Sequence, residues 1–287
     1  MNKQNTITFV PSHYAQCIDR YEVDLTNACS VNCCYCSLKN TKHQNVVSEP
    51  EFPLDFREKG IYLSPDCDPF ASNARAKAHE VLARFLPQGV PFLIITKCQI
   101  PSGTIELLAK YAPQVYVQVS ISRLDDTLNT YIEPGAASAQ ERLQTIRDLV
   151  SAGIRVTPVM MPLLPGVDDD YNKLSVLVQA CADAGAKYLK ASYVIINHNN
   201  TKQMKKMHGN AWTNWSLQYL NDEVNIHIGS GRTVNQYGRK QLYRTLTSMC
   251  SLCGMQFQAC PILDPTVLDM DVKLCATYRK KNGRKVN

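Results

Sequence analysis

The sequence of 287 residues lacks long apolar runs. Its first residues, MNKQNTITFVPSHY, have no apolar core of the kind that a secretory signal peptide needs. No other run approaches the roughly 20 residues of a membrane-spanning helix. We therefore expect a cytoplasmic protein with no membrane partner. Apolar residues still make up 45% of the chain, which can bury the core of one α/β barrel or of two modest domains.

The chain also lacks a strong charge of one sign. Its formal net charge is +6, and part of that charge comes from the tail RKKNGRKVN, residues 279–287. No pattern of aromatic residues suited to stacking on bases is found along the chain. Nucleic acid is therefore disfavoured as a partner, and a metabolite or nucleotide-like small molecule is the expected substrate.

Cysteine, by contrast, is abundant, with twelve residues. Disulfides are rare in a reducing compartment, so this number favours metal ligation. The stretch DLTNACSVNCCYCS, residues 24–37, holds Cys29, Cys33 and Cys36 in a C-x3-C-x2-C loop. Three thiolates can bind three irons of a 4Fe-4S cluster and leave the fourth iron without a protein ligand. Structural zinc is the alternative, but it needs four closed ligands, and Cys34 is badly placed because it adjoins Cys33.

A second cysteine group follows near the C-terminus. Its members are a C-x2-C pair, Cys250 and Cys253, and the later Cys260 and Cys275. We predict that they bind an auxiliary 4Fe-4S cluster, with zinc as the main alternative. Four thiolates favour an electron relay or a structural role, whereas three favour an open iron that anchors substrate or donates sulfur.

Strands and helices alternate through the first two thirds of the chain, which predicts parallel strands with helices packed outside. In residues 115–122, valine and isoleucine alternate with Tyr116, Gln118, Ser120 and Ser122, so one face is apolar and the other polar. Polar residues on one face suggest an open lumen that holds a ligand. The expected strands are 20–26, 60–64, 91–97, 115–122, 154–161 and 187–196.

Six such units predict the α/β class with a partial (β/α)6 TIM-type barrel over residues 1–196. Residues 197–287 are expected to form a helical, cysteine-rich C-terminal extension. Within it we expect a lid-like loop at 198–210, helices at 211–224 and 237–250, and the second cysteine group.

The cysteine loop, with Tyr35 before its last cysteine, resembles the signature of the radical SAM superfamily. The segments SPDCDPF (64–70), IITK (94–97) and SISRLDDTLNTYIEPGAASAQERL (120–143) resemble the spore photoproduct lyase branch of that superfamily. The resemblance covers roughly residues 20–196. It implies that S-adenosylmethionine (SAM) binds the open iron and is cleaved to a 5'-deoxyadenosyl radical, which abstracts hydrogen from a substrate. An external one-electron reductant such as flavodoxin or ferredoxin is also implied.

The same resemblance implies SAM contacts at Tyr35, Lys97 and Ser120, with Ser64, Cys67 and Asp68 near the ligand. Lys97 would pair with the methionine carboxylate and Ser120 with the ribose or amino-acid part. The alternatives are a lysine whose ammonium group reaches solvent and a serine hydroxyl bonded to backbone.

Two further pairs of residues are candidates for the site. Arg142 can bind a carboxylate bidentately and Glu133 can orient it, unless the two are a surface charge and a turn residue. The hydrogen-donating cysteine of the lyase aligns with Pro65, so Cys67 is the predicted catalytic thiol, with Cys98 as a second candidate. Packing is the alternative role for Cys98.

We predict a radical SAM enzyme that abstracts hydrogen from a C–H bond of a metabolite or nucleotide-like substrate. A DNA photoproduct lyase-like repair enzyme is one alternative. A non-enzymatic zinc-binding protein is another.

Overall fold

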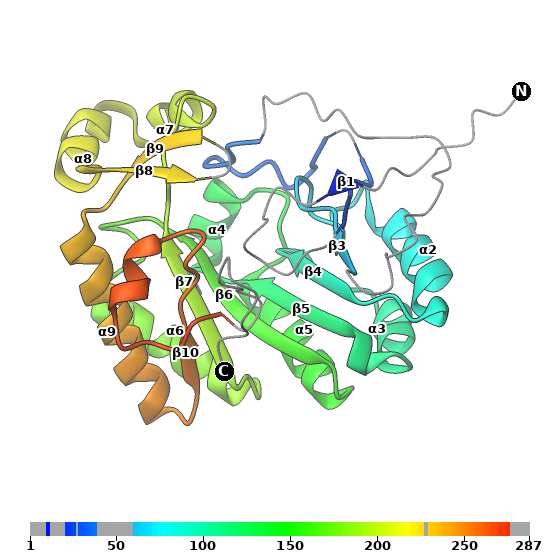
Figure 1. The fold of residues 1–287 in the computed structure, drawn as a ribbon. Helices are drawn as coiled ribbons and strands as arrows, with labels where there is room; N and C mark the ends of the chain where they lie inside the picture. Colours follow the sequence, from blue (N-terminus) through cyan, green and yellow to red (C-terminus); the bar gives the residue numbers. More distant parts are fainter. Residues whose placement is uncertain (1–9, 12–20, 27, 39–59, 227–228, 276–287) are drawn as a thin grey trace, which may run out of the picture.

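The computed structural model describes residues 10–11, 21–26, 28–38, 60–226 and 229–275, and its centre is a curved sheet (Figure 1). Over these ranges the sheet has eight strands in the order β1-β2-β3-β4-β5-β6-β7-β10. The short strand β1 (Val10–Pro11) pairs antiparallel with β2, and the other neighbours are parallel. None of the described helices is both long and apolar enough to cross a membrane.

The six predicted strands are confirmed, in the predicted order. Neighbouring strands pair in sequence order, so the carboxyl ends of all six lie at one edge of the sheet. The sheet is open, as expected of a partial barrel. The strands are β2 (Tyr21–Val23), β3 (Ile61–Leu63), β4 (Phe92–Thr96), β5 (Val115–Ser120), β6 (Arg155–Leu163) and β7 (Tyr188–Tyr193).

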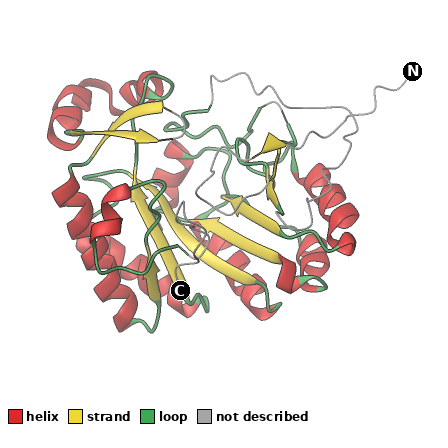
Figure 2. Cartoon of the chain, viewed as in Figure 1, coloured by secondary structure: helices red, strands yellow, loops and turns green. Residues whose placement is uncertain are grey.

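Helices cover the outer face of the sheet (Figure 2). The helix α5 (Ala139–Ser151) begins with a capping box, in which the side chains of Ser138 and Glu141 each accept a backbone N–H. It ends before Gly153, which has a φ of +71° that suits glycine. The helices between the strands are α2 (Arg75–Phe85), α3 (Ser102–Ala109), α4 (Asp126–Ile132), α5 (Ala139–Ser151) and α6 (Tyr171–Asp183). Single turns of 3-10 helix occur at Leu86–Gln88 and Ala112–Gln114.

The two faces of β5 differ as the sequence predicted. Val115, Val117 and Val119 belong to the large core between sheet and helices. Tyr116 belongs instead to a small separate cluster with Tyr62 and Leu93 on the inner face. The Tyr116 hydroxyl donates to Thr157 Oγ1 at 3.0 Å, so polar groups continue across to β6. The inner face of the sheet is therefore a mixed surface that can hold a ligand.

The region after β7 differs from the prediction. The segment expected to be a loop contains α7 (Thr201–His208), because Met204 packs fully buried and Lys205 and Lys206 favour helix. The predicted helix 211–224 ends early, as α8 (Trp212–Tyr219), and its last residues form a hairpin instead. The hairpin strands are β8 (Asp222–Ile226) and β9 (Gly229–Thr233), and Gly209–Ala211 forms a 3-10 turn.

The C-terminal part also adds a strand to the large sheet, which the sequence did not predict. The predicted helix 237–250 is confirmed as α9 (Gln236–Leu252), and β10 (Gln256–Gln258) follows it and pairs parallel with β7. Pro265–Asp269 forms a further 3-10 turn. The missed strand has only three residues, too few for an alternating pattern to be recognised. The domain boundary after residue 196 stays a prediction, but the sheet itself includes residues from both sides of it.

Candidate active site

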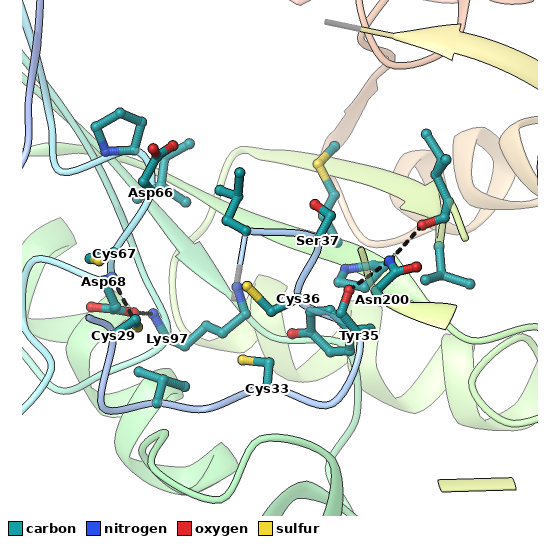
Figure 3. Close-up of a pocket in the computed structure, with 18 of the residues that line it drawn as sticks. Cys29, Cys33, Tyr35, Cys36, Ser37, Asp66, Cys67, Asp68, Lys97 and Asn200 are labelled. Carbon is teal, nitrogen blue, oxygen red and sulfur yellow. Dashed lines mark hydrogen bonds between the residues drawn. The ribbon is translucent and has the colours of Figure 1, made fainter. Parts of the chain in front are cut away.

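Three cysteines of one loop line a cavity at the carboxyl ends of the strands (Figure 3). The loop follows β2, and Cys29, Cys33 and Cys36 all contribute to the cavity, whose volume is about 310 Å³. The adjacent Cys34 faces the other way, with its Sγ 3.2 Å from Met207 Sδ on α7. The loop thus directs three thiols into the cavity and one away from it.

The cysteine loop is held by backbone contacts from the segment that follows α4. The Cys34 N–H donates to Ile132 O at 2.9 Å, and the Gly135 N–H donates to Val31 O at 2.9 Å. Gly135 has no room for a side chain, because a Cβ there would lie 2.3 Å from Ser30 O. Glycine is needed at this position for the two backbones to approach so closely.

Beneath the loop, a buried chain of polar groups fixes the aromatic ring of Tyr35. The Tyr35 hydroxyl donates to Glu133 Oε1, and Glu133 Oε2 lies 2.7 Å from Arg142 Nη2. Burial alone would raise the pKa of Glu133, but the positive charges of Arg142, Lys97 and Arg123 hold it below its ordinary value. Glu133 is therefore an ionised, fully enclosed partner of both Tyr35 and Arg142.

The donors of Arg142 are directed at this framework and away from the cavity. Its Nε donates to Ala137 O at 2.8 Å and its Nη1 to Ser120 O at 3.1 Å. Neither Arg142 nor Glu133 lines the cavity. The pair predicted from the sequence does meet, and in this arrangement it positions Tyr35.

The loop after β3 supplies Ser64, Cys67 and Asp68 to the cavity. The Asp68 carboxylate accepts from Thr96 Oγ1 at 2.7 Å and from the Lys97 N–H, which ties this loop to the end of β4. The Asp68 N–H and the Cys67 thiol both approach Cys29 Sγ. The hydrogen bond from Cys67 is the main reason that the pKa of Cys29 is lowered to about 6.

Ser64 has an unpaired hydroxyl at the cavity wall. It has an unusual φ of +52°, its N–H donates to Val23 O at 2.6 Å, and its side chain is buried. No described group hydrogen-bonds to its Oγ. A buried hydroxyl without a partner costs free energy unless a ligand or water satisfies it, so Ser64 is suited to contact a bound molecule.

Lys97 follows β4, and its side chain extends toward Cys36 and Tyr35 (Figure 3). Its ammonium nitrogen lies 5.9 Å from the centre of the Tyr35 ring. Burial works against the charged form, but Cys33 and the carboxylates of Glu133 and Asp68 raise the pKa of Lys97 above its ordinary value. The cavity therefore holds a fixed positive charge beside the cysteine loop.

Two further candidates, Ser120 and Cys98, also lie outside the cavity lining. The Ser120 hydroxyl donates to Met161 O at 3.1 Å, so it takes the backbone-bonded role that is the alternative to a ligand contact. The Cys98 thiol points toward Gly135 O at 3.9 Å, and burial raises its pKa. Cys67 is the better placed of the two predicted catalytic thiols, because it lines the cavity.

Asn200, which was not predicted from the sequence, joins the cavity to α7. Its Nδ2 donates to Tyr35 O and to Ile195 O, both at 2.9 Å (Figure 3). It connects the end of the last predicted strand segment to the cysteine loop. Only its place after that strand could have drawn attention to it, since an asparagine in the polar run HNNTK has no pattern of its own.

The C-terminal cysteines separate into two pairs. Cys250 and Cys253 lie at the end of α9, where Cys253 Sγ is 3.4 Å from Gln179 Oε1. Cys260 lies past the opposite end of β10, and its neighbour Cys275 accepts from Lys190 Nζ at 2.9 Å. The three strand residues between the pairs span roughly 10 Å. The two pairs lie on either side of β10, and the auxiliary cluster with these four ligands stays a prediction.

The donor chemistry at the two cysteine groups can be compared directly. Over the residues that the structure describes, no three His, Cys, Asp or Glu side chains are close enough to hold a single metal ion. An iron-sulfur cluster is larger than one ion, so its thiolates lie farther apart. Cys29, Cys33 and Cys36 share one cavity and fit that demand, whereas the C-terminal cysteines lie as two pairs on either side of β10.

A sequence model of the radical SAM superfamily matches residues 23–175, which is more than half of the chain. The chain belongs to the radical SAM superfamily. It is a radical SAM enzyme, and the family implies a 4Fe-4S cluster and SAM as cofactors. The matched residues contain the three thiols of the cysteine loop, together with Lys97 and the buried pair of Glu133 and Arg142.

Solved structures of spore photoproduct lyase have the same fold. One of them, in complex with dinucleoside spore photoproduct, matches with a TM-score of 0.66 and 14% identity, over 88% of this chain and 79% of that chain. A mutant with bound AdoMet and the same dinucleoside also has a TM-score of 0.66, with 13% identity over 87% and 78% of the two chains. This confirms the predicted radical SAM fold and its likeness to the lyase.

The curated relatives come from several sources. An uncharacterised protein, ORF301, of Acidianus two-tailed virus is 30% identical over 45% of this chain and 44% of its own. The radical SAM Nalpha-GlyT isomerase of Pseudomonas phage M6 is 21% identical over 69% of this chain and 42% of its own. This chain spans about half of the length of the curated relatives that it matches.

Proposed function

We propose that this radical SAM enzyme binds SAM in the cavity beside the cysteine loop and abstracts hydrogen from a C–H bond of a small, nucleotide-like or metabolite substrate. When bound, the cluster and SAM supply the radical chemistry: one electron breaks the sulfonium C–S bond, giving methionine and a 5'-deoxyadenosyl radical. The residues of the chain bind, orient and shield the reactants.

Lys97 and Ser64 are the proposed SAM contacts. The Lys97 ammonium group has a raised pKa and lies between cysteine and tyrosine side chains, so it can pair with the methionine carboxylate. The Ser64 hydroxyl has no described partner and is available to donate or accept. Asp68 would act as a positioning residue, because its carboxylate already holds the end of β4.

The size and lining of the cavity support a small substrate. A volume of about 310 Å³ lies at the lower end of the range for small-molecule pockets. Tyr62, Ile95, Ser192 and Met161 complete its wall on the side of the sheet. The lyase structures of similar fold hold a dinucleoside, which supports a nucleotide-like substrate and keeps photoproduct repair as the second candidate.

The second cluster is not needed for this function. Cys250, Cys253, Cys260 and Cys275 lie away from the cavity lining, so the auxiliary cluster predicted for them is a separate proposal. The proposal therefore depends on the three thiols of the cysteine loop, Cys29, Cys33 and Cys36, which all line the cavity, and this is the observation that carries it.

The test is production of 5'-deoxyadenosine by the anaerobically reconstituted protein with dithionite and SAM. We expect stimulation by the small-molecule fraction of a cell extract, and incorporation of deuterium into 5'-deoxyadenosine when that fraction is prepared from deuterium-grown cells. Stimulation by ultraviolet-irradiated DNA alone would establish the repair function instead. No 5'-deoxyadenosine under any condition would refute the proposal.

A further inference from the structure

The helix α7 (Thr201–His208) has two chemically distinct faces. Lys202, Lys205 and Lys206 are exposed, and their spacing of three and four residues places them on one side of the helix. Met204 is fully buried and Met207 half-buried on the opposite side. The helix contains no acidic residue. We call the side with the three lysines the lysine face.

The inner side of α7 lies directly against the cysteine loop. Met207 Sδ is 3.2 Å from Cys34 Sγ, and Cys34 is the immediate neighbour of the cavity thiol Cys33. At the start of the helix, the Asn200 side chain donates to Tyr35 O. Helix α7 itself, with Met207 on its inner side, therefore lies between the lysine face and the loop predicted to hold the cluster.

The positive charge of this face is not neutralised within the described chain. The salt bridges among described residues all use arginine, and none includes Lys202, Lys205 or Lys206. Lys205 Nζ lies 6.0 Å from the centre of the Trp212 ring, a contact that leaves its charge in place. The neighbouring helix α4 presents Tyr131, 60% exposed, whose hydroxyl donates to Met207 O.

Acidic residues on α4 do not neutralise the positive charge of the lysine face. Asp125 and Asp126 stand at the far end of α4 from Tyr131. The Asp125 carboxylate accepts from the Leu128 N–H and that of Asp126 from the Ala139 N–H, so both cap backbone. The lysine face is positive, and the exposed ring of Tyr131 lies next to α7.

We propose that the lysine face of α7 is the docking surface for an acidic one-electron carrier protein. The inference rests on the proposed function, because it assigns the route by which the reducing electron arrives. On docking, the reduced carrier loses one electron and the oxidised cluster gains it. An acidic protein complements the three lysines and needs only to approach the loop.

A nucleic acid substrate fits this face less well. None of the three lysines lines the cavity, so they cannot orient a substrate that reacts inside it. A carrier, in contrast, gains from being close to Cys33 without entering the cavity.

The experiment uses flavodoxin, an acidic flavoprotein, as the probe. We compare wild type with Lys202→Glu/Lys205→Glu/Lys206→Glu for flavodoxin affinity by calorimetry and for the rate of cluster reduction by photoreduced flavodoxin. The expected result is affinity weakened by about tenfold or more, with a binding constant that no longer falls as salt is raised. Reduction by dithionite, a small ion that does not dock, is expected to keep its wild-type rate.

A second variant, which reverses charge away from the lysine face, separates docking at that face from a general effect of charge reversal. Lys110→Glu/Lys187→Glu reverses two exposed lysines at the other end of the sheet, after α3 and before β7. It is expected to bind flavodoxin like wild type. Equal loss in both variants, or unchanged affinity in the triple variant, overturns the docking proposal. Loss of DNA binding instead of flavodoxin binding assigns the face to nucleic acid. Failure of dithionite to support SAM cleavage contradicts the proposed function and leaves the affinity result to decide docking separately.

Discussion

The two cysteine groups of this chain have similar residues and very different surroundings. Cys29, Cys33 and Cys36 line one cavity, whereas the C-terminal cysteines lie in pairs on either side of β10. Both groups contain a C-x2-C pair, so spacing alone would rank them together. The comparison teaches that local spacing makes neighbouring thiols available, while the fold decides whether distant thiols can share a ligand.

The loop around Cys33 is also supported from several directions. Contacts to it come from the end of α4, from the loop after β3 and from the start of α7. Among the C-terminal cysteines, Cys250 is fully buried in the core, and the Cys275 thiol accepts a hydrogen bond from Lys190 Nζ. A site for a large cofactor needs rigid support on all sides, and only the first group has it.

The largest expected effect comes from removing thiols of each group in turn. Cys29→Ala/Cys33→Ala/Cys36→Ala is expected to lose all cluster iron and all SAM cleavage. Cys253→Ala/Cys260→Ala, which removes one thiol from each C-terminal pair, is expected to keep the wild-type iron content of about four per chain. Anaerobic iron and sulfide analysis with Mössbauer spectroscopy measures both. About eight irons per chain in wild type, falling to about four in the second variant, would show that the C-terminal cysteines do bind an auxiliary cluster. The two cysteine groups would then not differ in their ability to bind a cluster.

The next largest effect concerns the buried ion pair under the cysteine loop. Arg142→Met leaves Glu133 as a buried charge without its partner, which costs about 3–5 kcal/mol of unfolding free energy. Adding Glu133→Gln removes the stranded charge and is expected to recover much of the loss. Urea denaturation of the apoprotein compares wild type with the single and double variants.

A second buried pair provides the control for this prediction. Arg239 Nε lies 2.9 Å from Asp264 Oδ2 in the C-terminal part, so Arg239→Met should destabilise the fold to a similar degree. Only Arg142→Met is expected to lower iron per folded chain, because only that pair contacts Tyr35 through Glu133. Equal iron loss in both variants would mean that cluster binding depends on the overall stability of the fold and not on the contact of Glu133 and Arg142 with Tyr35.

The smallest of these effects compares two glycines. Gly135→Ala brings a Cβ against Ser30 O and Val31 Cα, which are backbone atoms that can yield only if the cysteine loop shifts. We expect a cost of about 1–3 kcal/mol together with reduced iron content. Gly254→Ala, beside Cys253, meets no atom within 4 Å and suffers only from its φ of +69°, at about 1–2 kcal/mol. Thermal unfolding and iron analysis distinguish the two, and full iron content in Gly135→Ala would contradict the close-contact argument.

Much of the barrel could be predicted from the sequence, because its strands carry clear patterns. The alternation in residues 115–122 correctly separated Val117 from Tyr116, and the loops that followed the strands held Asp68 and Lys97 at the cavity. Carboxyl ends of parallel strands meet at one edge, so the order of strands and loops along the chain is enough to bring these distant residues together.

What could not be predicted depends on contacts between distant segments. The three residues of β10 become a strand only because β7 offers them an edge. Asn200 matters through the Tyr35 carbonyl, a partner that no local pattern reveals. The C-terminal cysteines were grouped because they are near in sequence, yet the helix end and the strand between them set the pairs apart.

The late strand β10 also has a consequence for how this protein is made. During synthesis, β7 is complete long before residue 256 leaves the ribosome, and until then one row of its backbone hydrogen-bonding groups is open. An unpaired edge on a nascent parallel sheet invites pairing with other chains. Once β10 has paired, the outer edge of the sheet is a strand of three residues instead of the six of β7, and a very short edge strand offers little to another chain.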